Sequence, residues 1–206
     1  ALDWLENTDQ IQGTDKDRMR MIVVHDTAQK GSPEELIDLQ HRGYDLGALC
    51  AAQRDGNALH VAAQYGRHRS CETLMAMGMK PEHRCFPLTS TALDEALINL
   101  HFSLFERMRK KSPKPTDHDQ NEWLMAAVSA KVRQSKNGND HPRARCVEYV
   151  LEKTGAMFSQ DILDTALFEA ARHGWPKTFR RLVDGGANPE RTHTLMGSHI
   201  FGEGSL

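Results

Sequence analysis

The chain has 206 residues, of which 39% are hydrophobic and only 6% aromatic, and its formal net charge is −2. Such a balanced charge gives no overall attraction to nucleic acid or to an anionic membrane surface. No apolar run approaches the roughly 20 residues that a membrane-spanning helix needs. The chain begins at Ala1 without a signal-like apolar segment, so we expect a processed fragment of a longer protein.

The N-terminal residues 1–16 contain a few large apolar side chains, among them Trp4 and Ile11. The first unit of a repeat array has no neighbour on one side, and we interpret these residues as a short helical cap that covers it. Asp15 or Asp17 would then be the N-cap of the following helix.

A first and worn helix–turn–helix unit is predicted for residues 17–46. Its apolar positions include Val24, Ala28 and Leu36, and glycines occupy the two places where a helix should end. The connection that follows, residues 44–54, carries the run A-L-C-A-A and is more apolar than an ordinary loop. We expect a helical turn within it.

The second unit, residues 55–81, is the clearest one in the first half of the chain. Leu59 and Ala62 are three residues apart on its first helix, as Cys71 and Leu74 are on its second. Residues at this spacing share one face of a helix. Each apolar stripe is narrow, so neither helix can bury it without neighbours.

A third unit, residues 88–115, follows in register, with Leu93 and Phe105 at the expected apolar positions. Residues 85–90 should form the loop that precedes it. Its second helix ends at Ser112, where the other units have glycine, and the prolines that follow prevent its continuation.

The fourth unit is predicted for residues 120–157, with helices over 121–130 and 142–154. Between them lies a polar, glycine-containing insertion at residues 131–141. Segments of this composition are commonly exposed on the protein surface.

The fifth unit, residues 162–189, repeats the second one closely. Its first helix carries Leu167, Ala170 and Ala171, and Trp175 should pack at the turn between the helices. The final residues, 190–206, form either a degenerate cap or the start of a truncated unit. A constant offset of 108 residues relates Leu59, Gly66 and Leu74 to Leu167, Gly174 and Leu182.

Periods of about 33 residues with a T-P-L-H-x-A-like start are typical of ankyrin repeats. The second unit carries N-A-L-H-V-A and the fifth T-A-L-F-E-A, and the chain resembles the ankyrin-repeat family over most of its length. The resemblance implies an all-α ankyrin-repeat solenoid of helix–turn–helix units with short β-turn fingers. It also implies a single domain over residues 1–206 and a concave surface that binds other proteins.

No motif for catalysis, a cofactor or a metal stands out. His25 and His60 occupy the histidine position of the ankyrin pattern, where the family's histidine bonds within the turn. The run Asp117 to Asp119, D-H-D, more often caps a helix than chelates a metal. The cysteines lack metal-site spacing, and Cys71 and Cys146 fall on apolar stripes, where free cysteine behaves as a small hydrophobe. We therefore expect no catalytic residues, no metal and no cofactor in this chain, and a reducing compartment.

Positive charge is concentrated in residues 107–145. Ten lysines and arginines there face four acidic residues, a net charge of +6, so the remainder of the chain carries −8. This is either an ordinary solvated face or a surface that attracts an acidic partner. Nucleic acid is a weaker alternative, because the only interleaved aromatic is Trp123, which fits a helix core better than a surface for base stacking. The predicted basic patch consists of Arg107, Arg109, Lys110, Lys111, Lys131, Arg133 and Lys136.

In the pattern L-H-x-A-A-x-x the variable positions should point away from the core, on the outer side of each first helix. Tyr65 is the strongest candidate for a contact residue, because tyrosine is frequent at interface hot spots. Val61 and Ile98 are apolar there, which either serves a partner or packs neighbouring helices. The predicted partner-binding residues are Asp26, Lys30, Val61, Gln64, Tyr65, Glu95, Ile98, Asn99, Glu169, Arg172 and His173.

The leading hypothesis is a non-enzymatic module that binds another protein, with an acidic surface favoured, through its concave face and fingers. Two alternatives stay open. One is the substrate-targeting ankyrin domain of a larger modifying enzyme, such as a bacterial effector ADP-ribosyltransferase, an analogy of architecture only. The other is self-association through an uncapped C-terminal end, although we expect a monomer. The expected location is the cytoplasm, or a host cytosol if the protein is an effector.

Overall fold

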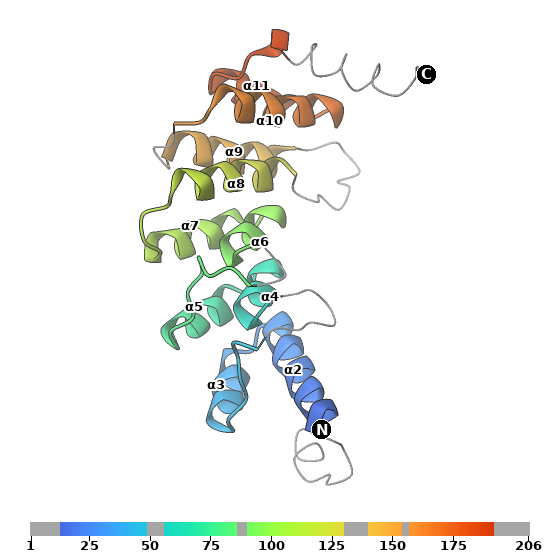
Figure 1. The fold of residues 1–206 in the computed structure, drawn as a ribbon, viewed down its shortest axis with the longest axis vertical. Helices are drawn as coiled ribbons and strands as arrows, with labels where there is room; N and C mark the ends of the chain where they lie inside the picture. Colours follow the sequence, from blue (N-terminus) through green and yellow to red (C-terminus); the bar gives the residue numbers. More distant parts are fainter. Residues whose placement is uncertain (1–12, 49–55, 86–89, 130–139, 154–156, 192–206) are drawn as a thin grey trace, which may run out of the picture. The chain divides into compact units, whose positions relative to one another are not determined.

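A computed structural model describes residues 13–48, 56–85, 90–129, 140–153 and 157–191, and these residues contain ten α-helices and no strand (Figure 1). None of these helices is both long and apolar enough to cross a bilayer. The expected all-α fold class is confirmed. The helices are α2 (Gly13–Lys30), α3 (Pro33–His41), α4 (Ala58–Gln64), α5 (His68–Ala76), α6 (Ala92–Ile98), α7 (Phe102–Lys111), α8 (Asp117–Val128), α9 (His141–Lys153), α10 (Gln160–Arg172) and α11 (Pro176–Asp184).

The chain divides into two compact units, each larger than one of the repeats predicted above. From here on 'first unit' and 'second unit' mean these two, and the repeats are called helix pairs; we describe each compact unit by itself. The first comprises Ala1–Ala96 with Ser103–Ser112, and the second Leu97–Phe102 with Pro113–Leu206. In the first unit α4 packs on α5, α2 on α4 and α3 on α5. In the second, α8 packs on α9, α10 on α11, α8 on α10 and α9 on α11. First helices thus stack on first helices and second helices on second helices, as in a helical repeat array.

The predicted apolar stripes form the core of both units. Leu59, Ala62 and Leu74 are fully buried in the first unit, as Leu167 and Leu182 are in the second. One stripe is narrower than predicted, since Ala171 is exposed although its neighbour Ala170 is buried. The buried strip of α10 is therefore one or two residues wide in each turn.

Two helix starts differ from the prediction. α2 begins at Gly13, before both Asp15 and Asp17, so neither of them is its N-cap, and Asp15 lies within the first turn. α8 begins at Asp117 rather than at residue 121. A capping box explains the earlier start: the Thr116 hydroxyl accepts from the Asp119 N–H, and the Asp119 carboxylate accepts from the Thr116 N–H at 2.9 Å. The D-H-D run therefore has the expected capping role.

Several predictions concern residues outside the described part of the chain. They are most of the N-terminal cap (1–12 of 1–16), of the loop (86–89 of 85–90), of the insertion (131–139 of 131–141) and of the tail (192–206 of 190–206). His141, counted as the last residue of the insertion, is the first residue of α9. Of the connection after the first pair, only residues 44–48 are described. They form a turn in which the Ala48 N–H donates to the Asp45 carbonyl at 3.3 Å.

The turn between the two helices of a pair needs a left-handed residue. Gly66 and Gly174 occupy this turn with φ of 67° in both cases. At the equivalent position of the third pair stands Leu100, with φ of 59°. A side chain with a Cβ atom is strained in this conformation by roughly 1–2 kcal/mol. The third pair therefore makes the same turn at a higher conformational cost.

Replacing Leu100 by glycine should stabilise the protein. Relief of the strain, reduced by the greater chain entropy of an unfolded glycine, leaves a gain of about 0.5–1 kcal/mol in the free energy of unfolding. Urea denaturation of the parent and Leu100→Gly measures it. Leu100→Ala keeps the strain and removes the side chain, so it should not stabilise. A loss of stability in Leu100→Gly would show that side-chain packing outweighs the backbone strain.

His60 links two neighbouring helix pairs of the first unit. Its Nδ1 lies 2.8 Å from the Asn57 side-chain oxygen, and its Nε2 lies 3.2 Å from the carbonyl of Ser90, just before the third pair. Both partners are oxygen acceptors and a neutral imidazole carries one N–H, so the ring donates to one of them at a time; the contact with Asn57 lies within the turn, where the ankyrin pattern places it. Burial lowers the pKa of His60 to about 4, because the loss of hydration outweighs the effect of the Ser90 carbonyl.

Acid should destabilise the protein through His60. The folded state holds the ring neutral, whereas the unfolded chain takes up a proton below its usual pKa of about 6.5. The contribution of the neutral His60 ring to the free energy of unfolding is complete above pH 6.5, and it falls by about 2 kcal/mol between pH 6.5 and 5. Urea denaturation across this range measures the slope. His60→Gln should remove it and the exposed His41→Gln should not; an unchanged slope in His60→Gln would contradict this assignment.

Candidate partner-binding surface

The predicted contact residues occupy corresponding positions near the C-terminal end of each first helix, and the structure divides them by accessibility. One of them, Val61, is only 3% exposed. α4 is buried on all sides from Ala58 to Ala63, because α2 and α5 both pack on it. Of the two alternatives for Val61, the structure supports packing between helices, and the predicted outward direction does not hold. The exposed residues are Asp26, Lys30, Tyr65, Arg172 and His173, and the half-buried ones are Gln64, Glu95, Ile98, Asn99 and Glu169.

In the first unit, the ends of α2 and α4 bring Lys30 and Tyr65 to the surface. Tyr65 is the C-cap of α4 and is 41% exposed. Lys30 pairs with Asp26 at 2.5 Å, one turn earlier on α2. The Arg67 guanidinium donates to the Gln29 carbonyl at 2.6 Å, which fastens the α4–α5 turn to the end of α2.

In the second unit, three predicted residues form one cluster at the end of α10. A guanidinium nitrogen of Arg172 lies 2.7 Å from a Glu169 carboxylate oxygen and 3.0 Å from Nε2 of His173. The same Nε2 lies 3.4 Å from the Glu169 carboxylate. The His173 ring stacks on Trp175, with the ring centres 4.7 Å apart and the planes inclined by 15°. The cluster of Glu169, Arg172, His173 and Trp175 is hereafter the α10 cluster.

A buried arginine supports the α10 cluster from below. The guanidinium carbon of Arg143, on α9, lies 3.4 Å from the centre of the Trp175 ring. Arg143 is only 1% exposed and therefore does not belong to the basic surface in which its charge was counted. Burial lowers its pKa, while the neighbouring Asp140 carboxylate acts in the opposite direction. Trp175 thus has the structural role predicted for it and also forms the base of the cluster.

Asp140 fixes the start of α11. Its carboxylate accepts from the N–H groups of Lys177 and Thr178, at 2.9 and 2.8 Å. Trp175 is the N-cap residue of this helix and makes no capping bond with its own side chain. A carboxylate from the preceding helix pair therefore satisfies the first N–H groups of α11, a role that the sequence did not reveal.

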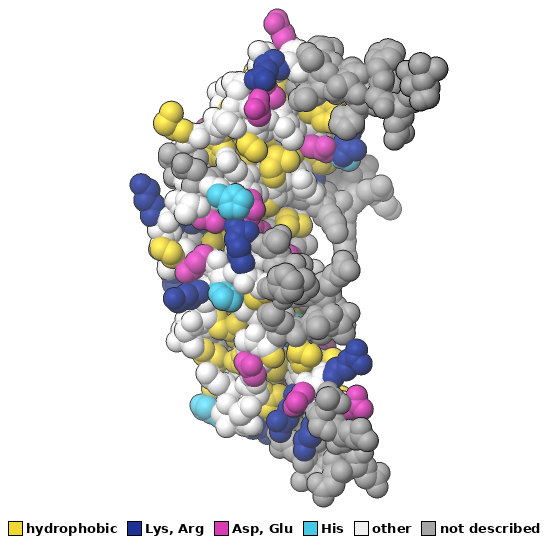
Figure 2. Space-filling view, in the orientation of Figure 1, with side chains coloured by type: hydrophobic (Ala, Val, Ile, Leu, Met, Phe, Trp, Pro, Cys, Tyr) yellow, Lys and Arg dark blue, Asp and Glu magenta, His cyan; other side chains and the backbone are white. Residues whose placement is uncertain are grey.

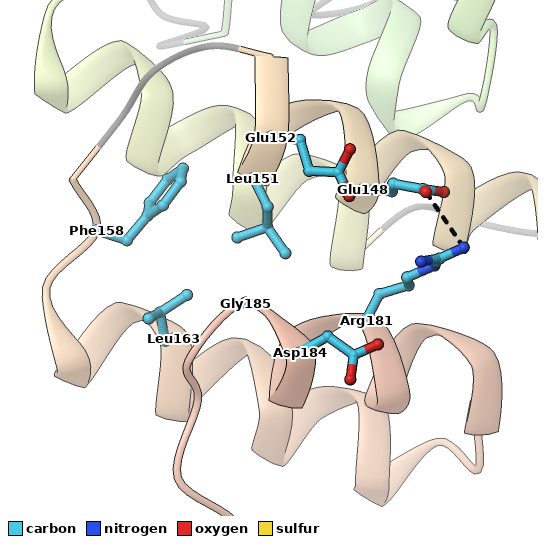
Figure 3. Close-up of a pocket in the computed structure, with 8 residues that line it drawn as sticks. All are labelled: Glu148, Leu151, Glu152, Phe158, Leu163, Arg181, Asp184 and Gly185. Carbon is cyan, nitrogen blue, oxygen red and sulfur yellow. Dashed lines mark ion pairs between the residues drawn. The ribbon is translucent and has the colours of Figure 1, made fainter.

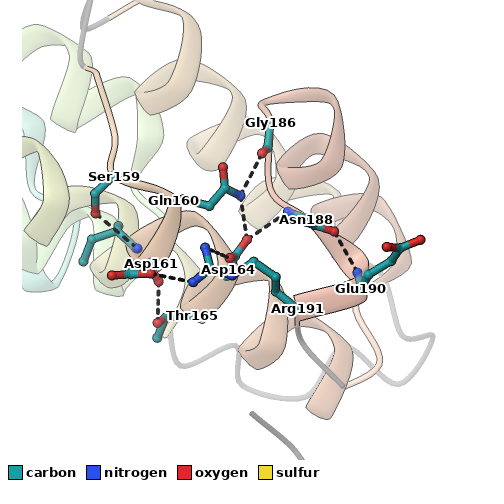
Figure 4. Close-up of polar contacts among 10 residues, drawn as sticks. Ser159, Gln160, Asp161, Asp164, Thr165, Gly186, Asn188, Glu190 and Arg191 are labelled. Atoms are coloured by element: carbon teal, nitrogen blue, oxygen red, sulfur yellow. Dashed lines mark hydrogen bonds and ion pairs between the residues drawn. The ribbon is translucent and has the colours of Figure 1, made fainter. Parts of the chain in front are cut away.

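A second buried carboxylate fixes the loop after α11 (Figure 4). Asp164, on α10, accepts from the Asn188 N–H and from the Gln160 side-chain amide, both at 2.8 Å. Its other oxygen pairs with Arg191 at 3.1 Å. This role was also missed, although the Asn-Pro that follows two glycines was a signal for a turn here. The loop beside α10 is therefore held by the core.

The basic patch carries less unpaired charge than its composition indicates. Arg107 forms an ion pair with Glu72, and Lys110 pairs with Glu106 at 3.0 Å. Arg109 donates to the Ser112 carbonyl at 3.3 Å. Lys111 is exposed. Figure 2 shows side chains of both charge signs interspersed on the face in view. Lys131, Arg133 and Lys136 lie outside the described residues.

Two of the described cysteines, Cys71 and Cys146, belong to the apolar core. Cys71 and Cys146 are fully buried, and desolvation raises the pKa of each thiol to about 12. They act as small apolar side chains, as predicted. Within the described residues, no group of three or more histidine, cysteine or acidic side chains could hold a metal ion.

Removing the Asp140 carboxylate should destabilise the second unit. Asp140→Ala leaves Arg143 buried without its nearby negative charge and two helix N–H groups without their acceptor, a loss of about 3 kcal/mol. Guanidinium denaturation followed by tryptophan fluorescence measures it. Asp161→Ala, which removes an exposed carboxylate, should change stability by at most about 1 kcal/mol. Equal effects of the two substitutions would contradict the capping role.

Comparison with protein family models found no match, nor did comparison with curated proteins. Among solved structures, the human ASB11 ankyrin repeat domain matches with 22% identity, over 80% of this chain and 84% of that one, with a TM-score of 0.49. The fold follows from the chain's own features, which are the paired helices, the repeated left-handed turns and the stacking of like helices within each unit. These features show a fold of stacked helix–turn–helix repeats, at the spacing that the ankyrin-like sequence pattern predicts.

Proposed function

We propose that this chain is a non-catalytic module that binds a partner protein through the ends of its first helices and the turns beside them. The observation that carries the proposal is the α10 cluster, in which exposed Arg172 and His173 are held in place by Glu169 and Trp175. Side chains that are already ordered lose little conformational entropy on binding. Arginine and aromatic residues are also the types that dominate interface energies.

Tyr65 extends the proposal to the first unit. It occupies the same repeat position as His173, 108 residues earlier, and is likewise exposed. An aromatic ring at an exposed helix end adds contact area at a small entropic cost. Each unit therefore presents a ring at the same place in its repeat.

The described charges support a partner recognised mainly through hydrogen bonds and aromatic contacts. Arg172 and Lys30 already pair with acidic residues of their own helices, so neither adds a net charge to the surface. The expectation of an acidic partner depends on Lys131, Arg133 and Lys136 and stays a prediction. So do the targeting role in a larger modifying enzyme, the monomeric state and the cytoplasmic location.

A capture experiment with two double variants tests this surface. Tyr65→Ala/Arg172→Ala removes one contact residue from each unit. Ile37→Ala/Arg180→Ala is the matched control, because Ile37 on α3 is 39% exposed and Arg180 is an exposed arginine on α11, both on second helices. Proteins retained from animal and bacterial cell lysates are quantified by mass spectrometry, after circular dichroism has confirmed that both variants fold.

The contact variant should retain a specific partner protein in an amount at least about tenfold lower than the parent does, as expected when two hot-spot side chains are removed. The control should retain it as the parent does. Equal retention by all three proteins would place the interface elsewhere, and equal losses in both variants would show a general effect rather than a contact surface.

A further inference from the structure

A small cavity opens in the second unit where α9, α10 and α11 meet (Figure 3). Its volume is about 210 Å³, less than the roughly 300–1,000 Å³ of sites for drug-sized ligands. It has room for one long side chain rather than for a whole cofactor. It is lined by Glu148, Leu151, Glu152, Phe158, Leu163, Arg181, Asp184 and Gly185.

The inner wall of the cavity is apolar. Leu151 of α9, Phe158 of the segment before α10 and Leu163 of α10 lie around the same space in Figure 3. Leu163 is buried, whereas Leu151 and Phe158 are half-buried and remain accessible. A Cβ atom on Gly185 would lie 2.8 Å from a methyl group of Leu151, so Gly185 lies directly against this wall. The wall suits a hydrocarbon chain.

The rim of the cavity is negative. Arg181 is the only cation among the lining residues, and it pairs with Glu148 at 3.2 Å. Glu152 and Asp184 are exposed, and neither forms an ion pair with any residue that the structure describes. In addition, α9 ends at Lys153 and α11 at Asp184, so the C-terminal ends of two helices lie at the cavity. The partial negative charge of a helix C-terminus favours a cation there.

From this arrangement we propose that the cavity binds a basic side chain, lysine or arginine, of a partner protein. The aliphatic stem lies against Leu151, Phe158 and Leu163, and the charged head lies between Glu152 and Asp184. Long basic side chains commonly bury the stem and keep the head near water. The site lies where the second helices α9 and α11 meet the start of α10, and it contains no residue of the α10 cluster, so its test is independent of the one for the proposed partner-binding surface.

Amide chemical shifts of the ¹⁵N-labelled 206-residue chain, titrated with n-butylammonium, test the proposal. This probe is the side chain of lysine without its backbone, and n-propylguanidinium is the corresponding probe for arginine. Neutral n-butanol has the stem without the charge. All titrations are run at one ionic strength. We expect saturable shifts at the Leu151 and Gly185 amides with an alkyl cation, and the tighter of the two cations identifies the residue.

Two variants test the role of the rim. Glu152→Gln/Asp184→Asn removes both charges with little change of shape, and it should weaken cation binding by about fivefold, as expected for the loss of two exposed ion pairs. Glu190→Gln removes an exposed carboxylate of the same unit away from the cavity and should bind as the parent does. The proposal is overturned if n-butanol produces the same shifts, if the double variant binds equally well, or if neither cation gives a saturable shift at Gly185.

Discussion

The structure depends on the burial of narrow apolar stripes by neighbouring helices. α4 has only seven residues, and a helix of this length is unstable alone in water. Packing against the next helix pair buries the apolar stripe and supplies the stability that the isolated helix lacks. Like helices therefore stack within each unit. Polar links then fix the pairs relative to one another, and they include the His60 bond to Ser90 and the Asp140 bonds to α11.

The sequence predicts the features that depend on short segments within one repeat, such as the buried face of a helix and the left-handed turn after it. Leu59 and Leu167 are buried as their spacing indicates, and Gly66 and Gly174 make the left-handed turns, because helix period and backbone conformation are properties of short segments. Val61 was misjudged because its surroundings come from other helices. No outward face exists on a helix that α2 and α5 enclose.

The sequence predicted which residues of the candidate site are exposed, but it did not predict which side chains hold them in place. The exposure of Tyr65, Arg172 and His173 follows from the repeat register. The support beneath them does not, because Arg143 and Trp175 come from different helix pairs, and a count of charges treats a buried arginine like a surface one. Asp140 was overlooked for the same reason, since its acceptor role joins residues 37 and 38 positions apart.

The bonds from Asp140 to α11 also bear on how the array comes apart. Repeat arrays usually fray from their ends, because a terminal unit has a neighbour on one side only. Here the first turn of α11 is held by a carboxylate that belongs to the preceding helix pair. Opening α11 would break that cap and leave Arg143 without the Trp175 ring against which it is packed. The α8–α9 and α10–α11 pairs should therefore open together, as one cooperative element.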